Sequence, residues 1–188
     1  MKFVMPRETL LQPLTQVSGV IERRQTLPVL ANVLIQAEDN RVACTGTDME
    51  VELKAEAEAT VQEAGRITVP ARKLVDICRA LPDGAEIQFS DDEGRVQLSS
   101  AKSRFTLSTL AAEEFPDSEQ AEALQEFELE ESAFRRVLEQ TAFAMANHDV
   151  RYDLNGLLLE LSDDRLRAVS TDGHRLALAE LETELAVG

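Results

Sequence analysis

Several residue types are scarce in this sequence, and each scarcity narrows the class of protein. Tryptophan is absent, tyrosine occurs once, and aromatic residues make up 4% of the 188 residues. No apolar run approaches the roughly 20 residues that a membrane-spanning helix needs. Residues 1–7 lack the apolar core of about 7–15 residues that marks a secretion signal. We therefore expect a cytoplasmic protein.

Cysteine and histidine are also rare, with two of each. Cys44 and Cys78 fall in apolar segments with no second cysteine nearby, so we expect reduced, buried thiols. The spacing of these four residues does not fit a structural zinc site. A glycine-rich phosphate loop and a nucleophile elbow are missing as well. We therefore expect no metal, no cofactor and no catalytic residue.

Basic residues are outnumbered, with 19 Lys and Arg against 35 Asp and Glu, which gives a net charge of −16. A protein that grips nucleic acid through its phosphates presents a basic face, because neutralised phosphates release counterions. Composition alone therefore argues against non-specific DNA binding. At 44% hydrophobic and 29% charged residues, the sequence is otherwise typical of a globular protein that buries a core.

An internal repeat organises the sequence. Residues 30–34 and 47–48 recur 124 residues later as residues 154–158 and 171–172. One register that holds over about 50 residues is hard to obtain by chance. We expect paired residues to occupy equivalent environments, among them Phe3 and Phe127, Leu10 and Phe134, and Leu14 and Leu138.

A second repeat lies within the first half, where Ile67-Thr68-Val69-Pro70 matches Phe3-Val4-Met5-Pro6 at a separation of 64 residues. The chain thus holds three copies of one repeat, which begin near Met1, Arg66 and Glu126. Each copy is predicted to run β-α-β-β-β, with an opening strand of alternating apolar residues and an amphipathic helix. The apolar residues of the three helices are Leu10, Leu14 and Val17; Leu74, Ile77, Cys78 and Leu81; and Phe134, Val137, Leu138 and Thr141.

Prolines and turn residues set the limits of the other predicted elements. Pro6 and Pro70 suit a first helical turn, whereas Pro13 falls inside a helix and predicts a kink. Asp, Asn and Gly clusters separate the remaining strands. These are 29–37, 42–45 and 49–55 in the first repeat, 86–89, 96–100 and 105–110 in the second, and 157–161, 166–169 and 176–181 in the third.

The repeats predict a domain organisation, because one helix cannot cover both faces of a sheet and leaves its edges open. We expect repeats 1–65 and 66–116 to share one domain with a two-helix, two-sheet core. Residues 117–125 form an acidic linker, since 105–134 holds nine acids and no Lys or Arg. Residues 126–188 make half a domain, so we expect a truncated chain or a missing half supplied by another chain.

Several stretches are distinctive in combination: Met1–Phe3, Thr26–Leu30, Thr45–Asp48, Val69–Lys73, Ser103–Leu110, Asp149–Tyr152, Leu154–Gly156 and Thr171–Leu176. In order and spacing they resemble bacterial DNA polymerase III beta subunits, the sliding-clamp family. The resemblance implies an α+β DNA-clamp fold with two repeats per domain, helices on one side and antiparallel sheets on the other. It also implies a homodimeric ring around duplex DNA that tethers DNA polymerase III during replication.

Family subunits hold six repeats, and this sequence matches three of them, so it resembles an N-terminal half. A ring holds DNA by topology and needs no tight phosphate grip, which reconciles the acidic composition with DNA. In the family the helices line the hole. A mildly basic lumen inside an acidic rim is therefore expected from the cations of the predicted helices, which are Arg7, Arg72, Lys73, Arg79, Arg135 and Arg136.

The resemblance implies a pocket for partner peptides, with one wall formed by Arg151, Leu154, Thr171, Gly173, His174, Arg175 and Leu176. The leucines would form an apolar floor, and Gly173 would let a peptide approach closely. His174 and Arg175 would donate hydrogen bonds. Asp172-Gly173 also fits a plain hairpin turn. The implied partners are the polymerase III alpha subunit, the clamp loader, and other clamp-binding polymerases and repair proteins.

The resemblance further implies DNA contacts by Arg24, His148, Arg151, Tyr152, Arg72, Lys73, Arg79 and Arg136. Tyr152 would stack on a base, although Asp153 stands where family members often carry a second aromatic residue. A solvated turn is the alternative for residues 148–152.

A third surface resembles the strand that pairs across the family's dimer interface: Lys102, Arg104, Phe105 and Leu107. An outward apolar residue beside two cations would suit strand addition. A plain hairpin strand with Phe105 in the core is the alternative. The family's partner surface lies in a domain that this sequence does not match, so we expect normal ring closure to fail.

Two other functions remain open. A short clamp-like interaction module would self-associate, or bind clamp partners without encircling DNA. A hydrolase would use Asp172 and His174 as an acid–base pair. However, Asp48 occupies the same repeat position without a histidine, which indicates that both aspartates cap turns.

Overall fold

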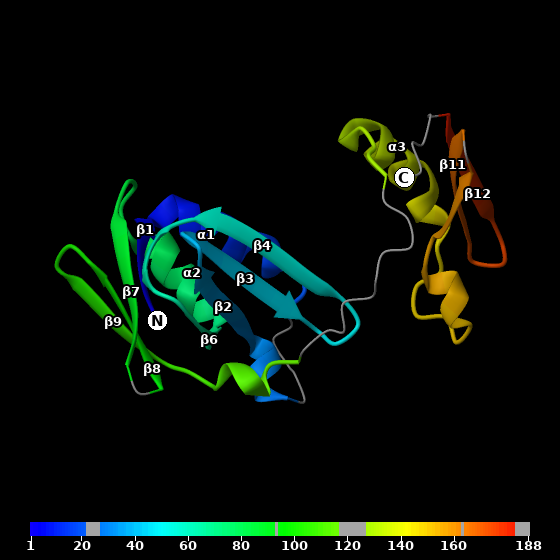
Figure 1. Ribbon diagram of the computed structural model, residues 1–188. Coiled ribbons are helices and arrows are strands. Elements are labelled where there is room, and N and C mark those ends of the chain that lie inside the picture. The colour runs from blue at the N-terminus through cyan, green and yellow to red at the C-terminus, as the bar shows by residue number, and fades with distance from the viewer. Residues whose placement is uncertain (22–26, 93, 117–126, 163, 183–188) are drawn as a thin grey trace. The chain divides into compact units, whose positions relative to one another are not determined.

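The computed structural model describes residues 1–21, 27–92, 94–116, 127–162 and 164–182. It divides into two compact units, here the N-terminal lobe, Met1–Glu119, and the C-terminal lobe, Gln120–Gly188 (Figure 1). The predicted linker falls among residues 117–126, outside the described residues, so its limits stay a prediction.

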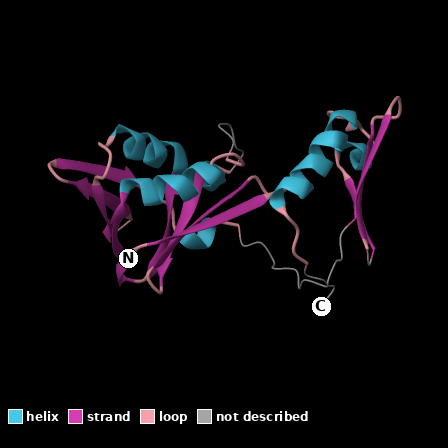
Figure 2. Cartoon of the chain, turned by 90° about the horizontal axis from the view of Figure 1, so that it is seen from above, coloured by secondary structure: helices cyan, strands magenta, loops and turns pink. Residues whose placement is uncertain are grey.

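The N-terminal lobe contains two antiparallel sheets. One has the order β5 (Thr60–Glu63), β1 (Lys2–Pro6), β7 (Glu86–Asp92), β8 (Arg95–Ser100) and β9 (Ser103–Ser108). The other has the order β4 (Glu52–Glu58), β3 (Arg41–Thr47), β2 (Asn32–Glu38) and β6 (Gly65–Pro70). Helices α1 (Arg7–Val17) and α2 (Ala71–Ala80) lie side by side on one side of the strands (Figure 2). The predicted clamp-type α+β fold is confirmed.

The two repeats of this lobe exchange their first strands. β1, from the first repeat, pairs with β7 of the second, and β6, from the second repeat, pairs with β2 of the first. The exchange brings Phe3 onto Phe89 as a stacked pair with ring centroids 4.6 Å apart. Both rings are fully buried in one continuous core. Neither repeat therefore has a complete sheet without the other.

Both helices bury most of the apolar residues that their spacing predicts, including Leu10, Leu14 and Cys78, whereas Ile77 is partly buried. Pro13 is buried inside α1, which continues through it to Val17. The expectation that Pro6 and Pro70 occupy the first helical turn is wrong by one residue. Both precede the helix as N-cap residues, because they are the last residues of the strands β1 and β6.

Arg7 differs from the other cations of the predicted helices, because it is largely buried and paired. Its side chain is 12% exposed and forms ion pairs with Glu8 and Asp83. It also donates a hydrogen bond to the carbonyl of Cys78 at 3.3 Å. Arg7 thus links the start of α1 to the end of α2, and its charge is neutralised where it lies.

The C-terminal lobe consists of α3 (Glu131–Thr141) and a sheet of β10 (Leu158–Ser162), β11 (Arg165–Thr171) and β12 (Leu176–Glu182). Its small core contains Val137, Ala168 and Ala179. Two single-turn 3₁₀ helices, Ala142–Ala144 and Tyr152–Asn155, connect α3 to the sheet.

The strand predicted at Phe127 and Leu129 is wrong, since residues 127–130 have no regular structure. Phe127 is 39% exposed, whereas its repeat counterpart Phe3 is fully buried. Leu138 is likewise only partly buried, unlike Leu14. The reason is the strand exchange: Phe3 is covered by the second repeat, and the described part of the C-terminal lobe has no second repeat.

Hydrogen bonds confirm the repeat itself. The cross-strand pairs Leu34–Thr45 and Thr47–Glu52 recur, 124 residues later, as Leu158–Val169 and Thr171–Leu176. Asp48 Oδ1 accepts from the backbone N–H groups of the second and third residues after it, and Asp172 Oδ1 does the same. The prediction that both aspartates cap turns is confirmed.

Two parts of the first repeat differ from the prediction. Pro28–Ala31 forms a 3₁₀ turn instead of the start of a strand, with Pro28 in its first position. Met49 occupies the turn before β4 with a φ of 81°, and the short strand β5 was not predicted. Gly173 takes the place of Met49 in the third repeat and has a φ of 87°.

We predict that Met49→Gly stabilises the N-terminal lobe. A side chain at this positive φ is strained, and relief of the strain outweighs the extra chain entropy of glycine by roughly 0.5 kcal/mol. Thermal unfolding followed by circular dichroism should show a higher midpoint. Glu50→Gly, in the same turn but without a positive φ, is the control and should lower it. A lower midpoint for Met49→Gly would contradict the prediction.

Candidate functional site

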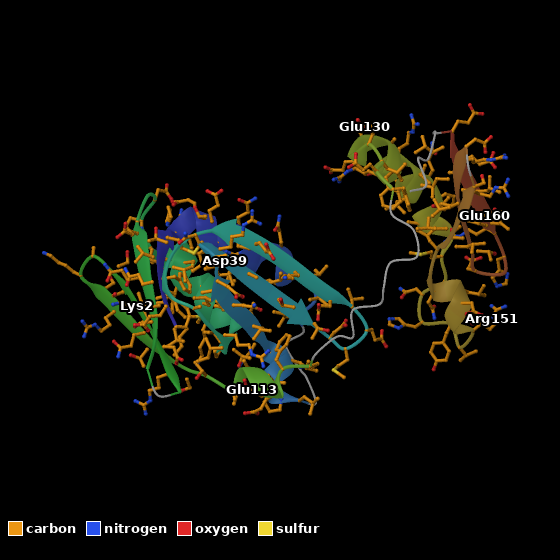
Figure 3. All side chains as sticks on the ribbon, in the orientation of Figure 1. Lys2, Asp39, Glu113, Glu130, Arg151 and Glu160 are labelled. Atoms are coloured by element: carbon orange, nitrogen blue, oxygen red, sulfur yellow. The ribbon has the colours of Figure 1, made fainter. Side chains whose placement is uncertain are left out.

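The loop before β10 holds Arg151 in a fixed position. Asp149 and Asn155 join the ends of this loop: the Asp149 N–H donates to Asn155 Oδ1, and Asn155 Nδ2 donates to the Asp149 carbonyl, each at 2.9 Å. The Arg151 guanidinium then donates two hydrogen bonds to the Asp149 carboxylate, at 3.0 and 2.8 Å. Figure 3 shows the position of Arg151 in the C-terminal lobe.

Arg151 meets the hairpin between β11 and β12. Its Nη2 donates to the Asp172 carbonyl at 3.4 Å. A Cβ on Gly173 would lie 3.3 Å from both Nη1 and Nη2, so the guanidinium lies against the bare backbone of the glycine. Two segments that are 20 residues apart in sequence therefore form one surface, as predicted for Arg151, Thr171 and Gly173.

The hairpin is held by its own polar side chains. Thr171 Oγ1 donates to the Arg175 carbonyl at 2.6 Å and accepts from the Gly173 N–H at 3.1 Å. Asp172 Oδ2 accepts from Arg175 Nε at 3.0 Å. The Arg175 guanidinium lies 5.6 Å from the centre of the Phe143 ring, within the range of a cation–π contact.

Asp172 serves the backbone. The N–H groups of Arg175 and His174 hydrogen-bond to its carboxylate and lower its pKa, and the charge of Arg175 adds to the effect. Among the hydrogen bonds of the described residues, none joins this carboxylate to the imidazole of His174. The geometry therefore fits a turn cap and does not form an acid–base pair.

Exposed leucines border the hairpin. Leu154 is partly buried, whereas Leu176 and Leu178 are 65% and 53% exposed. Leu178 pairs across the sheet with Val169, which pairs with the exposed Leu158, so an apolar row crosses all three strands. We name Leu158, Val169, Leu176 and Leu178 the outer apolar face.

Sequence reasoning missed Leu158, Leu178 and Phe143, and it named Asp149 only as part of the run 148–152 without its contact to Arg151. A signal for Leu178 was present, because Leu176 and Leu178 alternate along one strand and their repeat counterparts are the charged residues Glu52 and Lys54. Apolar residues that replace charged ones on an outward face indicate a binding surface.

The residues predicted to contact DNA divide between the lobes. Arg72, Lys73 and Arg79 are exposed on α2 and line one hollow of about 580 Å³ together with Asp76. Arg136 is exposed on α3, and His148 and Tyr152 are exposed in the loop of Arg151. Tyr152 is 86% exposed, which leaves both ring faces accessible. Arg24 lies outside the described residues.

The predicted dimer-edge residues lie on or beside β9, an edge strand that pairs with β8. The expectation of an outward apolar residue is wrong. Leu107 is buried and Phe105 packs against the same core, because the alternation of the strand turns both inward. Lys102 and Arg104 are exposed, so the outer surface of this edge is basic.

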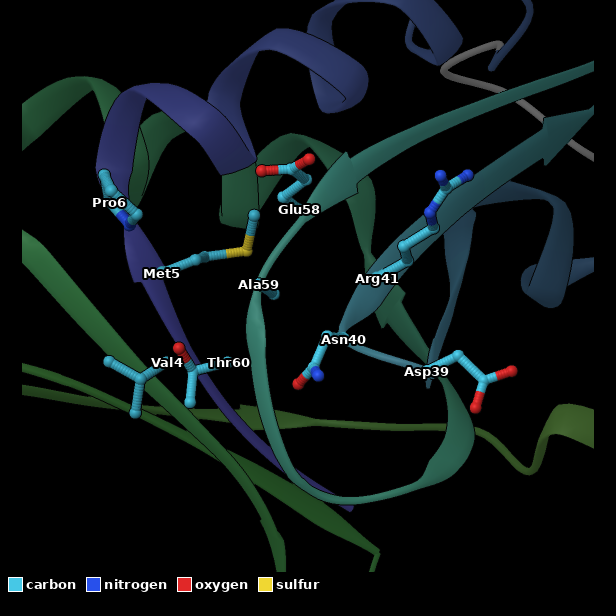
Figure 4. Close-up of a pocket in the computed structure, with 9 residues that line it drawn as sticks. All are labelled: Val4, Met5, Pro6, Asp39, Asn40, Arg41, Glu58, Ala59 and Thr60. Carbon is cyan, nitrogen blue, oxygen red and sulfur yellow. The ribbon is translucent and has the colours of Figure 1, made fainter.

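A separate cavity of about 390 Å³ lies at the junction of the two sheets of the N-terminal lobe (Figure 4). It is lined by the end of β1, the turn Asp39–Arg41 and the segment Glu58–Thr60. None of the predicted site residues contributes to it. Among the described residues no group of three or more His, Cys, Asp or Glu is placed to hold a metal ion. No helix in the described ranges is long and apolar enough to cross a membrane.

The repeated unit of one helix followed by antiparallel strands defines a clamp-type protein, and comparison with known proteins agrees. Family models for the DNA polymerase III beta subunit match the chain twice, as the N-terminal domain over residues 1–119 and as the central domain over residues 128–187. The chain belongs to the DNA polymerase III beta subunit family.

Individual relatives support the same family membership. The beta sliding clamp of Pseudomonas putida is 52% identical over 186 residues, and that of Escherichia coli K12 is 49% identical over 183 residues. The crystal structure of the DNA polymerase III subunit beta from Pseudomonas aeruginosa superimposes with a TM-score of 0.94 at 48% identity, and the match covers 99% of this chain. The chain spans about half of each relative: 51%, 50% and 51%.

We predict that Asp149 titrates well below the 3.8 of an unperturbed aspartate. Its pKa is lowered first by the hydrogen bonds from the Arg151 side chain, then by the Arg151 backbone N–H. Because the folded pKa is the lower one, the stabilising contact is complete above pH 3.8 and is lost only as the pH falls through the lowered pKa. NMR titration of the carboxyl group measures this midpoint.

The matched variants are Arg151→Ala and Arg175→Ala. The first removes the hydrogen bonds to Asp149 and should move the midpoint up toward 3.8. The second removes the hydrogen bond from Arg175 Nε to the Asp172 carboxylate and should leave the titration midpoint of Asp149 unchanged. An Asp149 midpoint near 3.8 in the unaltered protein would show that the contact does not form in solution.

Proposed function

We propose that this chain is the N-terminal part of a DNA-replication processivity factor. In this proposal the complete ring encircles duplex DNA and tethers DNA polymerase III and other clamp-binding proteins. The observation that carries it is the wall made by Arg151, Leu154 and the hairpin 171–176, which is rigidly held, partly apolar and open to a partner. The chain itself has a binding role and no catalytic one.

The wall has the features that a docked peptide needs. Leu154 and Leu176 supply an apolar floor, and Gly173 offers backbone that no side chain covers. Arg175 is fixed by Asp172 and Phe143, so its remaining N–H groups point from a defined position. Ordering such donors before binding reduces the entropy that a partner has to offset.

DNA would be held by enclosure, with weak phosphate contacts. Arg72, Lys73 and Arg79 share one hollow with a single carboxylate, Asp76. In the proposed ring this face of α2, together with Arg136, Arg24, His148 and Tyr152, is directed toward the duplex. The overall charge of −16 keeps other nucleic acid away from the outer surface. Such a protein works in the cytoplasm, where the replication machinery is.

The edge of β9 would serve ring closure. Its backbone has β8 on one side, and the described residues provide no strand on the other. Lys102 and Arg104 flank this edge. A partner strand with acidic side chains would add to the sheet there. Phe105 and Leu107 would contribute by stiffening the edge from within, since both pack against the core.

A second candidate function is an interaction module that self-associates, or binds clamp partners without encircling DNA. The observation in its favour is the set of apolar side chains that remain exposed on the C-terminal lobe, including Phe127, Leu159 and Leu161. Exposed apolar surface of this kind marks an interface.

We predict that Leu176→Asp weakens binding of the DNA polymerase III alpha subunit of Pseudomonas putida at least about tenfold, because a charge replaces an apolar contact worth roughly 1.5–3 kcal/mol. Surface plasmon resonance with the immobilised chain measures the dissociation constant.

The control is Val51→Asp, which places the same charge on an exposed residue in the equivalent turn of the first repeat. It should leave the affinity within about twofold, since surface substitutions away from a binding site have small effects. Equal loss in both variants would indicate a general charge effect, and unchanged binding by Leu176→Asp would refute the docking wall.

A further inference from the structure

The four charged residues of α2 share one face of the helix. Arg72, Lys73, Asp76 and Arg79 are exposed and line the hollow of about 580 Å³. The apolar residues of the helix face the core on its other side. The neighbouring helix α1 has only two charged residues, and these pair with each other. Of the two helices, α2 therefore carries the positive charge.

Helix stability does not explain the cations of α2. Arg72 and Lys73 stand in its first turn, which has no acidic residue. The helix dipole places partial positive charge at this end, so a cation is unfavourable there and a carboxylate is favourable. The ion pairs among the described residues of the N-terminal lobe use other cations: Met1, Arg7, Arg41, Lys54 and Arg66. The described part of the chain therefore leaves the charge of α2 available to an anionic ligand.

Asp76 is the one residue of α2 that neighbours all three cations along the helix. It lies four residues after Arg72, three after Lys73 and three before Arg79. Residues three and four apart are adjacent on a helix surface. A carboxylate at such a separation lowers the positive potential at each cation, since the Debye length is about 8 Å at physiological ionic strength. Three cations and one carboxylate leave this face with a net charge of +2.

Among the described residues Asp76 has no structural partner. It lies in the middle of α2 and caps neither end. The ion pairs of the lobe do not include it. On α3, by contrast, Glu131 and Arg135 are four residues apart and pair at 2.7 Å. The spacing on α2 permits such pairs, yet the carboxylate of Asp76 forms none with the three cations around it.

We propose that Asp76 limits the affinity of this face for duplex DNA. The inference rests on the proposed function, because it concerns the same face of α2. Every nucleotide of a duplex carries a phosphate, so each position along the DNA presents the same charges to the face. Asp76 therefore lowers the attraction equally at every position. A contact that is weak everywhere lets the protein move along the duplex.

Asp76→Asn tests this role, because it removes the charge and keeps the shape of the side chain. The whole chain with this substitution should bind a fluorescently labelled duplex roughly fivefold more tightly than the unaltered chain at about 50 mM salt. Fluorescence anisotropy measures the dissociation constant. The gain should shrink about threefold when the salt is raised to about 200 mM, since one more phosphate charge is neutralised. Asp76→Glu keeps the charge and should restore the unaltered affinity within about twofold.

The control for net charge is Asp39→Asn. Asp39 is an exposed carboxylate in the turn between β2 and β3, where it lines the cavity between the two sheets (Figure 4). Its φ is 47°, a conformation that asparagine also adopts. The substitution changes the charge of the chain by the same amount and should alter the affinity for DNA less than about twofold. Equal gains in Asp39→Asn and Asp76→Asn would show a general charge effect and overturn the proposal.

Arg79→Ala separates the inference from the proposed function. It removes one phosphate contact and should weaken binding at least about threefold at about 50 mM salt. If Arg79→Ala weakens binding and Asp76→Asn does not strengthen it, the DNA contact of α2 stands and the role of Asp76 is refuted. If neither substitution alters binding, the proposed DNA face and the role of Asp76 fail together.

Discussion

The exchange of first strands between repeats is the constraint on which the N-terminal lobe depends. β1 of the first repeat pairs with β7 of the second, and β6 of the second repeat pairs with β2 of the first. The stacked pair Phe3–Phe89 lies where the two repeats meet. Burial of such rings contributes only when both repeats are present, so each repeat stabilises the other.

The same constraint explains where prediction from sequence succeeded and where it failed. Periodicity and turn residues are local, and they placed the three helices and the hairpins correctly. Phe127 has the pattern of a strand residue as clearly as Phe3 does. Whether the pattern becomes a strand depends on a partner such as β7, which is a long-range property. The expected equivalence of Phe3 and Phe127 therefore failed although the repeat is real.

The candidate site shows a similar division. Thr171 and Gly173 were expected from the family resemblance, and the turn cap of Asp172 was predicted because its repeat counterpart Asp48 occupies the same position. The direct contact of Arg151 with Gly173 could not be predicted from the sequence, because it depends on how the Asp149–Asn155 loop folds back. The outward orientation expected for Phe105 was wrong, because the pairing of β9 with β8 determines which side of the sheet each residue faces.

Charge distribution joins the fold to the proposed function. The charge of Arg7 is paired with Glu8 and Asp83, and its guanidinium also donates a hydrogen bond at the end of α2. Arg135 forms an ion pair with Glu131. The charged residues of α2 are three cations, Arg72, Lys73 and Arg79, and one carboxylate, Asp76. A face with so small an excess of positive charge cannot hold DNA tightly at physiological salt, because each phosphate contact adds only modest, salt-sensitive affinity. Weak attraction is what a sliding tether requires, since tight phosphate contacts would stop it moving. The acidic composition that first argued against DNA binding therefore fits a protein that retains DNA by enclosure.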